Sequence, residues 1–160
     1  MITIKSSIKL NWQLAYIGII KNWISPKHVL TFIDTEELNK LDENTIGDLY
    51  SLEEGSKDEF VKILEKITNI TDTRFAENLY IWGILFLNDI NTNQKTTSEK
   101  LKEIANIWVM VDYPENWKPF IYYMPQKEDK PVGGDYLYQK FINFLEVENL
   151  KLKQKGQVIQ

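Results

Sequence analysis

The residues of this chain that could support acid–base chemistry are one histidine and many carboxylates. His28 is the only histidine. A catalytic histidine needs an oriented carboxylate and a nucleophile beside it, but the spacing puts Asp34 and Glu36 on other helical turns. We therefore interpret His28 as a partly exposed residue in the first turn of a helix. One imidazole cannot build a multi-histidine metal site, and the chain has no cysteine for thiolate ligands or disulfides.

Carboxylates at adjacent positions recur in the first half of the chain: Glu36-Glu37, Asp42-Glu43, Glu53-Glu54 and Asp58-Glu59. Adjacent side chains on a helix do not face each other, so these are not ready-made acid–base pairs. No calcium-loop spacing appears, and Gly133-Gly134 lacks the lysine and further glycines of a phosphate loop. The sequence thus predicts no catalytic residue, metal or cofactor, and solvated surface is the simplest interpretation of these pairs.

The acidic segment, residues 34–59, carries most of the charge asymmetry. It has ten acidic residues against Lys40 and Lys57, a net charge of −8, while the rest of the chain sums to +4. Either this is only a solvated helix surface, or it is a negative surface that steers a basic partner. For the second interpretation the candidate partner-binding residues are Glu36, Glu37, Asp42, Glu43, Asp48, Glu53 and Glu54.

A second candidate surface is the aromatic segment, Tyr113–Pro125, which holds three prolines and five aromatic residues. Exposed aromatic side chains anchor protein interfaces, so Trp117, Tyr122 and Tyr123 are further candidate partner-binding residues. The same residues would serve equally as a lid over the core between the last two helices. Both interpretations stay open at this point.

Composition favours a single globular domain with long helices. Of the 160 residues 43% are hydrophobic and 26% charged, and only seven glycines and five prolines interrupt the chain. A net charge of −4 and a single arginine, Arg74, argue against a nucleic-acid partner. No apolar run is long enough to cross a membrane, and the N-terminus lacks a signal-peptide pattern, so we expect a cytoplasmic protein.

The elements are predicted from apolar periodicity. Leu79–Leu87 is a run of nine apolar or small residues, and a helix apolar on all sides is buried. We therefore predict Thr73–Asn91 as the buried central helix of an all-α, single-domain bundle of about six or seven helices, in which Leu79, Trp82 and Phe86 are nearly inaccessible. The domain is expected to cover residues 1–153, followed by a flexible tail at residues 154–160.

Capping residues and prolines set the other predicted boundaries. A first helix over Asn11–Ile24 is followed by Ser25-Pro26, a helix start. Capping boxes are predicted at Ser56/Glu59 and at Thr96/Glu99, with Ser98 as an alternative cap. Three more segments complete the prediction: Asp112-Tyr113-Pro114 as a helix stop, Gln126–Gly134 as an exposed loop, and Asp135–Lys153 as the last helix. Residues Ile2–Ile8 stay ambiguous, since Ile2 and Ile4 alternate as in a short strand.

Four stretches, in this order, resemble a small family of bacterial helical domains of unknown function: Trp23-Ile24-Ser25-Pro26, the central aromatic helix, Asp112-Tyr113-Pro114 and Tyr123-Met124-Pro125. The resemblance covers nearly the whole chain and carries no catalytic motif. Some members lie beside polymorphic toxin genes, as immunity proteins do. The resemblance therefore implies a helical fold and, for function, an immunity protein.

Three hypotheses of function follow. The first is a non-enzymatic binding protein, most specifically an immunity protein that occludes a basic toxin through the acidic segment. The second is a helical module that associates with itself, a homodimer, because five tryptophans and eight tyrosines are a large aromatic content. The third is a carboxylate-dependent hydrolase, which would require a pocket with two converging carboxylates of perturbed pKa.

Overall fold

The computed structural model describes residues 9–126 and 133–156, and within them the fold is all-α. The described residues contain eight α-helices and one 3₁₀ helix. The elements are α1 (Trp12–Ile20), α2 (Pro26–Phe32), α3 (Thr35–Leu38), α4 (Glu43–Ser51), α5 (Lys57–Thr68), α6 (Asp72–Thr92), α7 (Thr97–Met110), η1 (Glu115–Phe120) and α8 (Gly134–Gln154). The predicted alternation at Ile2–Ile8, most of the predicted loop and the end of the tail lie outside the described residues.

The described residues contain more helices than the predicted six or seven, and two short elements, α3 and η1, account for the difference. α3 has four residues and none of them is buried, while η1 contains Pro119 and lies in the aromatic segment. Apolar periodicity becomes visible only over two or more turns, so neither helix gives a signal of that kind.

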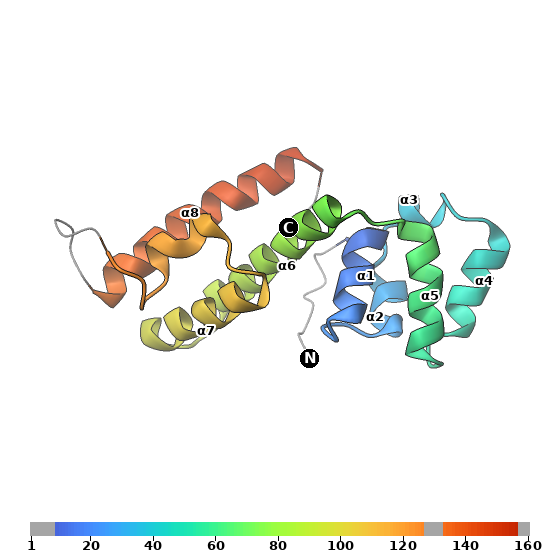
Figure 1. Ribbon diagram of the computed structural model, residues 1–160, viewed down its shortest axis with the longest axis horizontal. Helices are drawn as coiled ribbons and strands as arrows, with labels where there is room; N and C mark the ends of the chain where they lie inside the picture. Colours follow the sequence, from blue (N-terminus) through green and yellow to red (C-terminus); the bar gives the residue numbers. More distant parts are fainter. Residues whose placement is uncertain (1–8, 127–132, 157–160) are drawn as a thin grey trace. The chain divides into compact units, whose positions relative to one another are not determined.

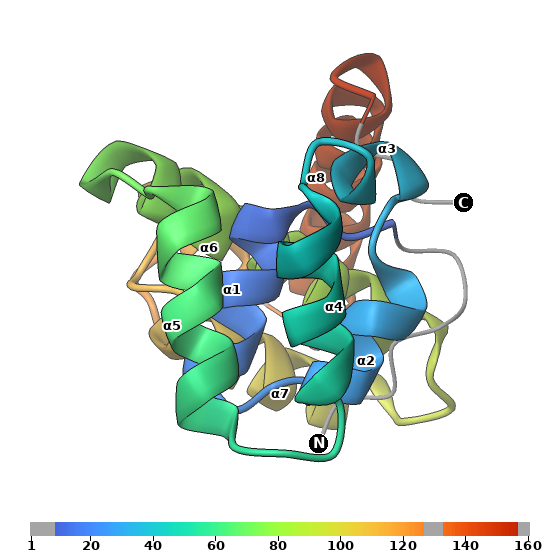
Figure 2. The same ribbon diagram turned by 90° about the vertical axis from the view of Figure 1, so that its right-hand side faces the viewer.

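Contacts divide the chain into two compact units, residues 1–79 with 156–160 (unit 1) and residues 80–155 (unit 2). In unit 1, α1 packs along α5, and α4 also contacts α5 (Figures 1 and 2). The chain entering α1 pairs with the end of α2: the N–H of Leu10 donates to the carbonyl of Phe32, and the N–H of Asp34 to that of Leu10, both at 2.9 Å. Leu10 is fully buried, so this isolated bridge fixes α2 to the core of the unit.

α1 ends at Ile20, four residues before the predicted end. Asn22 adopts a left-handed conformation with φ 58°. The N–H of Trp23 then reaches the carbonyl of Gly18 at 2.8 Å, and that of Asn22 reaches Ile19 at 3.0 Å. This pair of bonds is a Schellman motif, and asparagine tolerates its left-handed position. The predicted helix was too long because Trp23 and Ile24 continue the apolar spacing, although they pack against the protein only after the chain has turned.

The predicted start at Ser25-Pro26 is confirmed. The hydroxyl of Ser25 accepts a hydrogen bond from the N–H of His28 at 3.3 Å, and Pro26 occupies the first turn of α2. The Nδ1 atom of His28 lies 2.6 Å from the same hydroxyl. His28 is half-buried in the first turn, as the sequence predicted.

α6 occupies almost the residues that the apolar run predicted. Leu79, Trp82 and Phe86 are 7%, 1% and 4% exposed, so their predicted inaccessibility is confirmed. The helix begins in unit 1 and continues into unit 2, since the boundary falls between Leu79 and Tyr80. That α6 is the centre of one bundle stays a prediction. Within the described ranges, none of the helices combines the length and apolarity that crossing a membrane requires.

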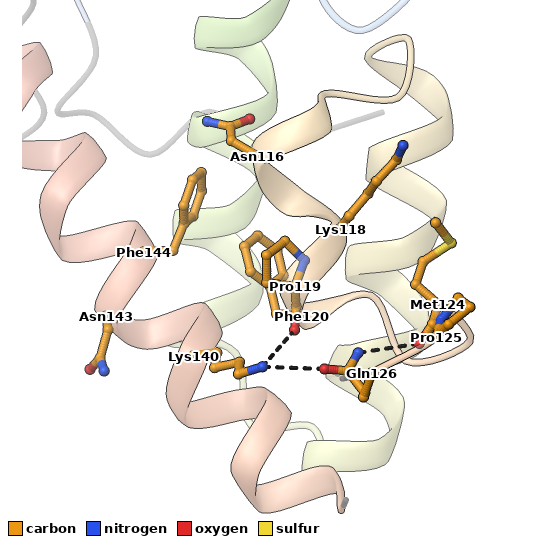
Figure 3. A pocket seen from close by; sticks show the side chains of 10 residues that line it. All are labelled: Asn116, Lys118, Pro119, Phe120, Met124, Pro125, Gln126, Lys140, Asn143 and Phe144. Carbon is orange, nitrogen blue, oxygen red and sulfur yellow. Dashed lines mark hydrogen bonds between the residues drawn. The ribbon is translucent and has the colours of Figure 1, made fainter. Parts of the chain in front are cut away.

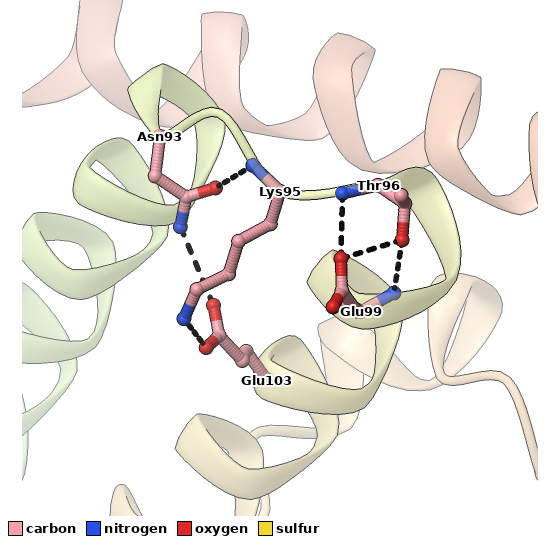
Figure 4. A network of polar contacts seen from close by, with 5 residues as sticks. All are labelled: Asn93, Lys95, Thr96, Glu99 and Glu103. Carbon is pink, nitrogen blue, oxygen red and sulfur yellow. Dashed lines mark hydrogen bonds and ion pairs between the residues drawn. The ribbon is translucent and has the colours of Figure 1, made fainter.

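In unit 2, α8 packs against α7 and against η1 (Figure 1). α7 begins with the predicted capping box, with Thr96 rather than Ser98 as the cap (Figure 4). Oε2 of Glu99 accepts from the N–H of Thr96 at 2.9 Å and from its hydroxyl at 2.7 Å. These bonds favour the ionised carboxylate and lower the pKa of Glu99, with the hydroxyl contributing most.

α7 ends at the predicted stop. Asp112 and Tyr113 both adopt left-handed conformations, with φ 65° and 56°. The N–H of Tyr113 bonds back to the carbonyl of Trp108 at 2.9 Å, and the indole N–H of Trp108 donates to the carbonyl of Pro114 at 3.0 Å. Two consecutive left-handed residues cost free energy, and the side chain of Trp108 helps to hold this turn.

Candidate functional site

The acidic segment contains the starts of three helices, α3, α4 and α5. Asp34 caps α3 and Asp42 caps α4, each accepting a backbone N–H at 3.0 Å. The first helical turns hold five more carboxylates, those of Glu36, Glu37, Glu43, Asp58 and Glu59. Negative side chains are favoured at helix N-termini by capping and by the helix dipole. Helix starts therefore account for seven of the ten acidic residues.

Asp42 shows how such a carboxylate is held. Its Oδ2 accepts from the Thr45 hydroxyl at 2.7 Å, and its Oδ1 accepts from the Thr45 N–H at 3.0 Å. The hydroxyl bond first, and the backbone bond second, lower the pKa of Asp42 below its ordinary value. The ionised form of Asp42 thus supports the start of α4.

Thr45→Val is expected to raise the pKa of Asp42 toward the ordinary value of about 3.9, because it removes the hydroxyl donor and keeps the side-chain shape. In the native protein the folded-state pKa is the lower one, so the unfolded state binds protons more readily. The contribution of Asp42 to stability is then fully present above about pH 4 and is lost as the pH falls toward the folded pKa. A side-chain carboxyl titration by NMR measures the shift. Thr45→Ser keeps the hydroxyl and should leave the pKa low, and an unchanged pKa in Thr45→Val would contradict this assignment.

Few charges of the acidic segment are neutralised by a neighbouring lysine. Lys9 lies 3.3 Å from Asp34, Lys27 lies 3.0 Å from Glu54, and Lys40 pairs with Glu37. Lys57 instead donates to the amide oxygen of Asn22. Among the described residues, seven acidic side chains of the segment have no cation at ion-pair distance: Glu36, Asp42, Glu43, Asp48, Glu53, Asp58 and Glu59.

Helix dipoles offset only a small part of the negative charge. A helix N-terminus corresponds to roughly +0.5 charge, so three of them remove about 1.5 charges. The segment carries −8. Structural causes explain why the carboxylates are there, but the surface stays strongly negative.

Most of the acidic residues belong to the segments that precede and follow α4, and Figures 1 and 2 show the course of the ribbon through α4 between these segments. Residues 34–43 lie at its start and residues 53–59 beyond its end, with Asp48 on the helix between them. α4 has nine residues and is therefore about 14 Å long. This exceeds the screening length of about 8 Å at physiological salt. Most of the predicted negative surface is thus two acidic patches, one within residues 34–43 and one within residues 53–59, with Asp48 alone between them.

The aromatic segment divides into a buried part and an exposed part. Trp117 and Phe120 are 0% and 1% exposed, and the Trp117 ring lies 6.1 Å from that of Tyr80 and 6.0 Å from that of Phe144. A 3₁₀ helix has three residues per turn, so η1 places Trp117 and Phe120 on one face against α8. The prediction of Trp117 as a partner-binding anchor is wrong, since it belongs to the core of unit 2.

Tyr122 and Tyr123 remain exposed, at 48% and 51%, as an interface would need. The ring of Tyr123 lies 5.1 Å from that of Tyr122 and 6.1 Å from the ring of Trp108. Tyr113 is 50% exposed and contacts the same tryptophan edge-on at 5.0 Å. We call these three residues the tyrosine patch.

Sequence reasoning missed Val109 and Met110. The signal was present, because both fall outside the apolar stripe of α7 formed by Leu101, Ile104, Ala105 and Trp108. An apolar residue that lies off the stripe at a helix end is expected to be exposed, and Val109 and Met110 are 47% and 38% exposed.

Sequence reasoning also missed a pocket in unit 2 (Figure 3). Its volume is about 560 Å³, and its wall comes from η1, the residues after it and α8. Lys118 and Lys140 supply two cationic groups, and the half-buried Phe144 supplies the accessible aromatic surface, while Phe120 borders the pocket but is only 1% exposed. No carboxylate belongs to the described lining. No local pattern predicts this site, because its residues are brought together only by the packing of α8.

Comparison with known proteins places the chain in a family. No curated protein and no solved structure matches it. A model of a family described as an uncharacterised protein conserved in bacteria (DUF2247) matches residues 1–149, and the chain therefore belongs to this family.

Proposed function

We propose that this protein is a binding protein without a reaction of its own, and that it holds a basic protein partner on the two acidic patches of unit 1. The observation that supports the proposal is the set of seven carboxylates without an ion-pair partner in the described chain. Six of the seven are exposed and Glu53 is half-buried, so a cation can approach them from solvent.

The arrangement suits steering rather than tight anchoring. Exposed charges raise association rates through long-range attraction, while single surface ion pairs add little affinity. Because the patches lie about 14 Å apart along α4, a partner that engages both needs two basic clusters at a similar separation. An immunity protein that covers a basic toxin is a function of this kind, since occlusion requires complementary charge and no catalysis.

The test is the association rate of a partner captured from the native host. A variant with six neutral replacements, Glu36→Gln, Glu43→Gln, Asp48→Asn, Glu53→Gln, Asp58→Asn and Glu59→Gln, removes no ion pair and no helix cap. Its association rate in stopped-flow mixing should fall by about tenfold or more at low salt. The wild-type rate should decrease steeply as salt rises, because screening weakens the attraction.

The control compares equal charge changes at different places. Glu53→Gln with Asp58→Asn and Glu59→Gln alters one acidic patch, whereas Glu77→Gln with Asp135→Asn and Glu146→Gln removes three exposed charges elsewhere. The first triple variant should slow association more than the second. A partner with an acidic contact surface contradicts the proposal. An association rate that changes neither with salt nor with the six replacements also contradicts it.

Self-association is the second candidate function, and the tyrosine patch favours it. Eight large hydrophobic side chains are exposed among the described residues, and three of them form this patch. A twofold dimer that buries the patch in both copies would remove this aromatic surface from water. Light scattering across a concentration series separates the candidates, since a monomer at all concentrations contradicts this one and leaves the first intact.

A further inference from the structure

The geometry points to a binding site in unit 2 for a small organic anion, in which Lys140 holds a carboxylate or phosphate group and the aromatic wall holds a flat apolar body. The site is the pocket of about 560 Å³ in Figure 3. Pockets that take small molecules range from about 300 to 1,000 Å³ and combine apolar walls with a few polar groups. This pocket has both properties.

Lys140 is the group that selects an anion. Its Nζ lies 3.2 Å from the amide oxygen of Gln126, 3.4 Å from the carbonyl of Pro119 and 4.5 Å from the ring centre of Tyr136. These three partners are neutral, and within the described chain no carboxylate forms an ion pair with Lys140. Within the part of the chain that the structure describes, the ammonium group is therefore held in place without being neutralised, and an anionic ligand would supply the missing charge.

The second cation of the pocket differs. Lys118 pairs with Glu115 at 2.7 Å, but that carboxylate is 81% exposed and one turn away on η1. An ion pair at such an exposed position is weak, so Lys118 can exchange its partner for a ligand at small cost. Lys140 is thus the main anion-binding group and Lys118 a secondary one.

The remaining wall favours a ligand with an apolar body over a purely inorganic ion. The rings of Phe120 and Phe144 lie 4.9 Å apart at an inclined angle, and Met124 and Pro125 close another side. Asn116 and Asn143 add neutral amides that can donate hydrogen bonds. A small inorganic anion would leave the apolar surface of the pocket exposed to water, whereas a ligand with an aromatic or short acyl body would cover that surface.

The experiment is a titration of ¹⁵N-labelled protein with benzoate, followed by NMR. We expect saturable shifts at residues 118–126 and 140–144 and at the side-chain amides of Gln126 and Asn143. A ligand of this size binds a real site with a dissociation constant of about 1–10 mM. Benzamide, which keeps the ring and lacks the charge, should bind at least about tenfold more weakly. Inorganic phosphate should also bind at least about tenfold more weakly, because it lacks the apolar body.

Lys140→Met should weaken benzoate binding by about tenfold or more, and Lys153→Met, which removes an exposed charge from the same helix, should not change it. Equal binding of benzamide and benzoate by the wild-type protein overturns the proposal without any variant, so the test does not depend on the folding of Lys140→Met. If phosphate binds as tightly as benzoate, the proposed contribution of the apolar wall is wrong. If the chemical shifts never saturate, or if Lys140→Met binds benzoate as tightly as the wild-type protein, the proposed site is wrong altogether. The acidic patches of unit 1 take no part, so the outcome is independent of the proposed partner.

Discussion

Trp117→Ala is expected to lower the free energy of unfolding by about 3–5 kcal/mol, the range for deleting a large aromatic side chain from a packed core. Trp117 is fully buried among Tyr80, Phe120 and Phe144. Among the described residues its indole N–H makes no hydrogen bond of ordinary geometry, although it lies near enough to the Tyr80 hydroxyl to act on the pKa of that group, so the substitution loses mainly packing. Urea denaturation followed by circular dichroism measures the change.

Tyr123→Ala provides the control from the same aromatic segment. Tyr123 is half exposed, so its removal should cost less than about 1 kcal/mol, as is usual for surface positions. If Trp117→Ala changes the free energy of unfolding only slightly but abolishes binding of a partner, Trp117 acts as an exposed anchor, which contradicts the structure.

Gly83→Ala is expected to destabilise the protein although alanine is the better helix former. A Cβ atom at Gly83 would lie 2.9 Å and 3.1 Å from two ring carbons of Trp117 and 3.2 Å from Cγ1 of Val111. Helix propensity favours alanine by about 1 kcal/mol, and overpacking of a core costs about 1–3 kcal/mol. Both side chains are buried, with Trp117 0% and Val111 4% exposed, and the branched valine is stiff at its first torsion, so neither can move away easily and we expect overpacking to dominate.

Gly47→Ala is the matched comparison, because Gly47 lies within α4 and no atom is within 4 Å of a Cβ built there. This substitution should stabilise the protein by about 0.5–1 kcal/mol. In a Trp117→Phe background the cost of Gly83→Ala should shrink, since the smaller ring leaves room for the methyl group. Stabilisation by both alanines in the wild-type background would show that α6 and Trp117 do not meet at Gly83.

The sequence was most informative where the signal is local. Ser25 and Thr96 were identified as caps from residue type and spacing, and the extent of α6 followed from an apolar run without a polar face. The end of α1 was predicted too late, because Trp23 continued the stripe while Asn22 had already turned the chain. Each of these features depends on residues within one or two turns.

Burial of a particular aromatic residue depends on distant residues and was harder to predict. Trp117, Tyr122 and Tyr123 are close in sequence and similar in type, yet α8 covers the first and leaves the other two exposed. The pocket is a stronger case, since Lys118 and Lys140 come from η1 and α8 and nothing in their local sequence relates them. The acidic segment was identified correctly as a charge excess, but its division into two patches required the position and length of α4.

The continuity of α6 has a consequence for how this chain can be inherited. Modular proteins exchange parts by recombination at flexible connections, where a cut leaves both sides intact. Here the boundary between the two units falls inside one uninterrupted 21-residue helix, between Leu79 and Tyr80. A crossover at that point would divide the helix and expose the apolar residues on both sides of the cut. We therefore expect the two units to be inherited together in one chain, and neither unit to occur alone in other proteins.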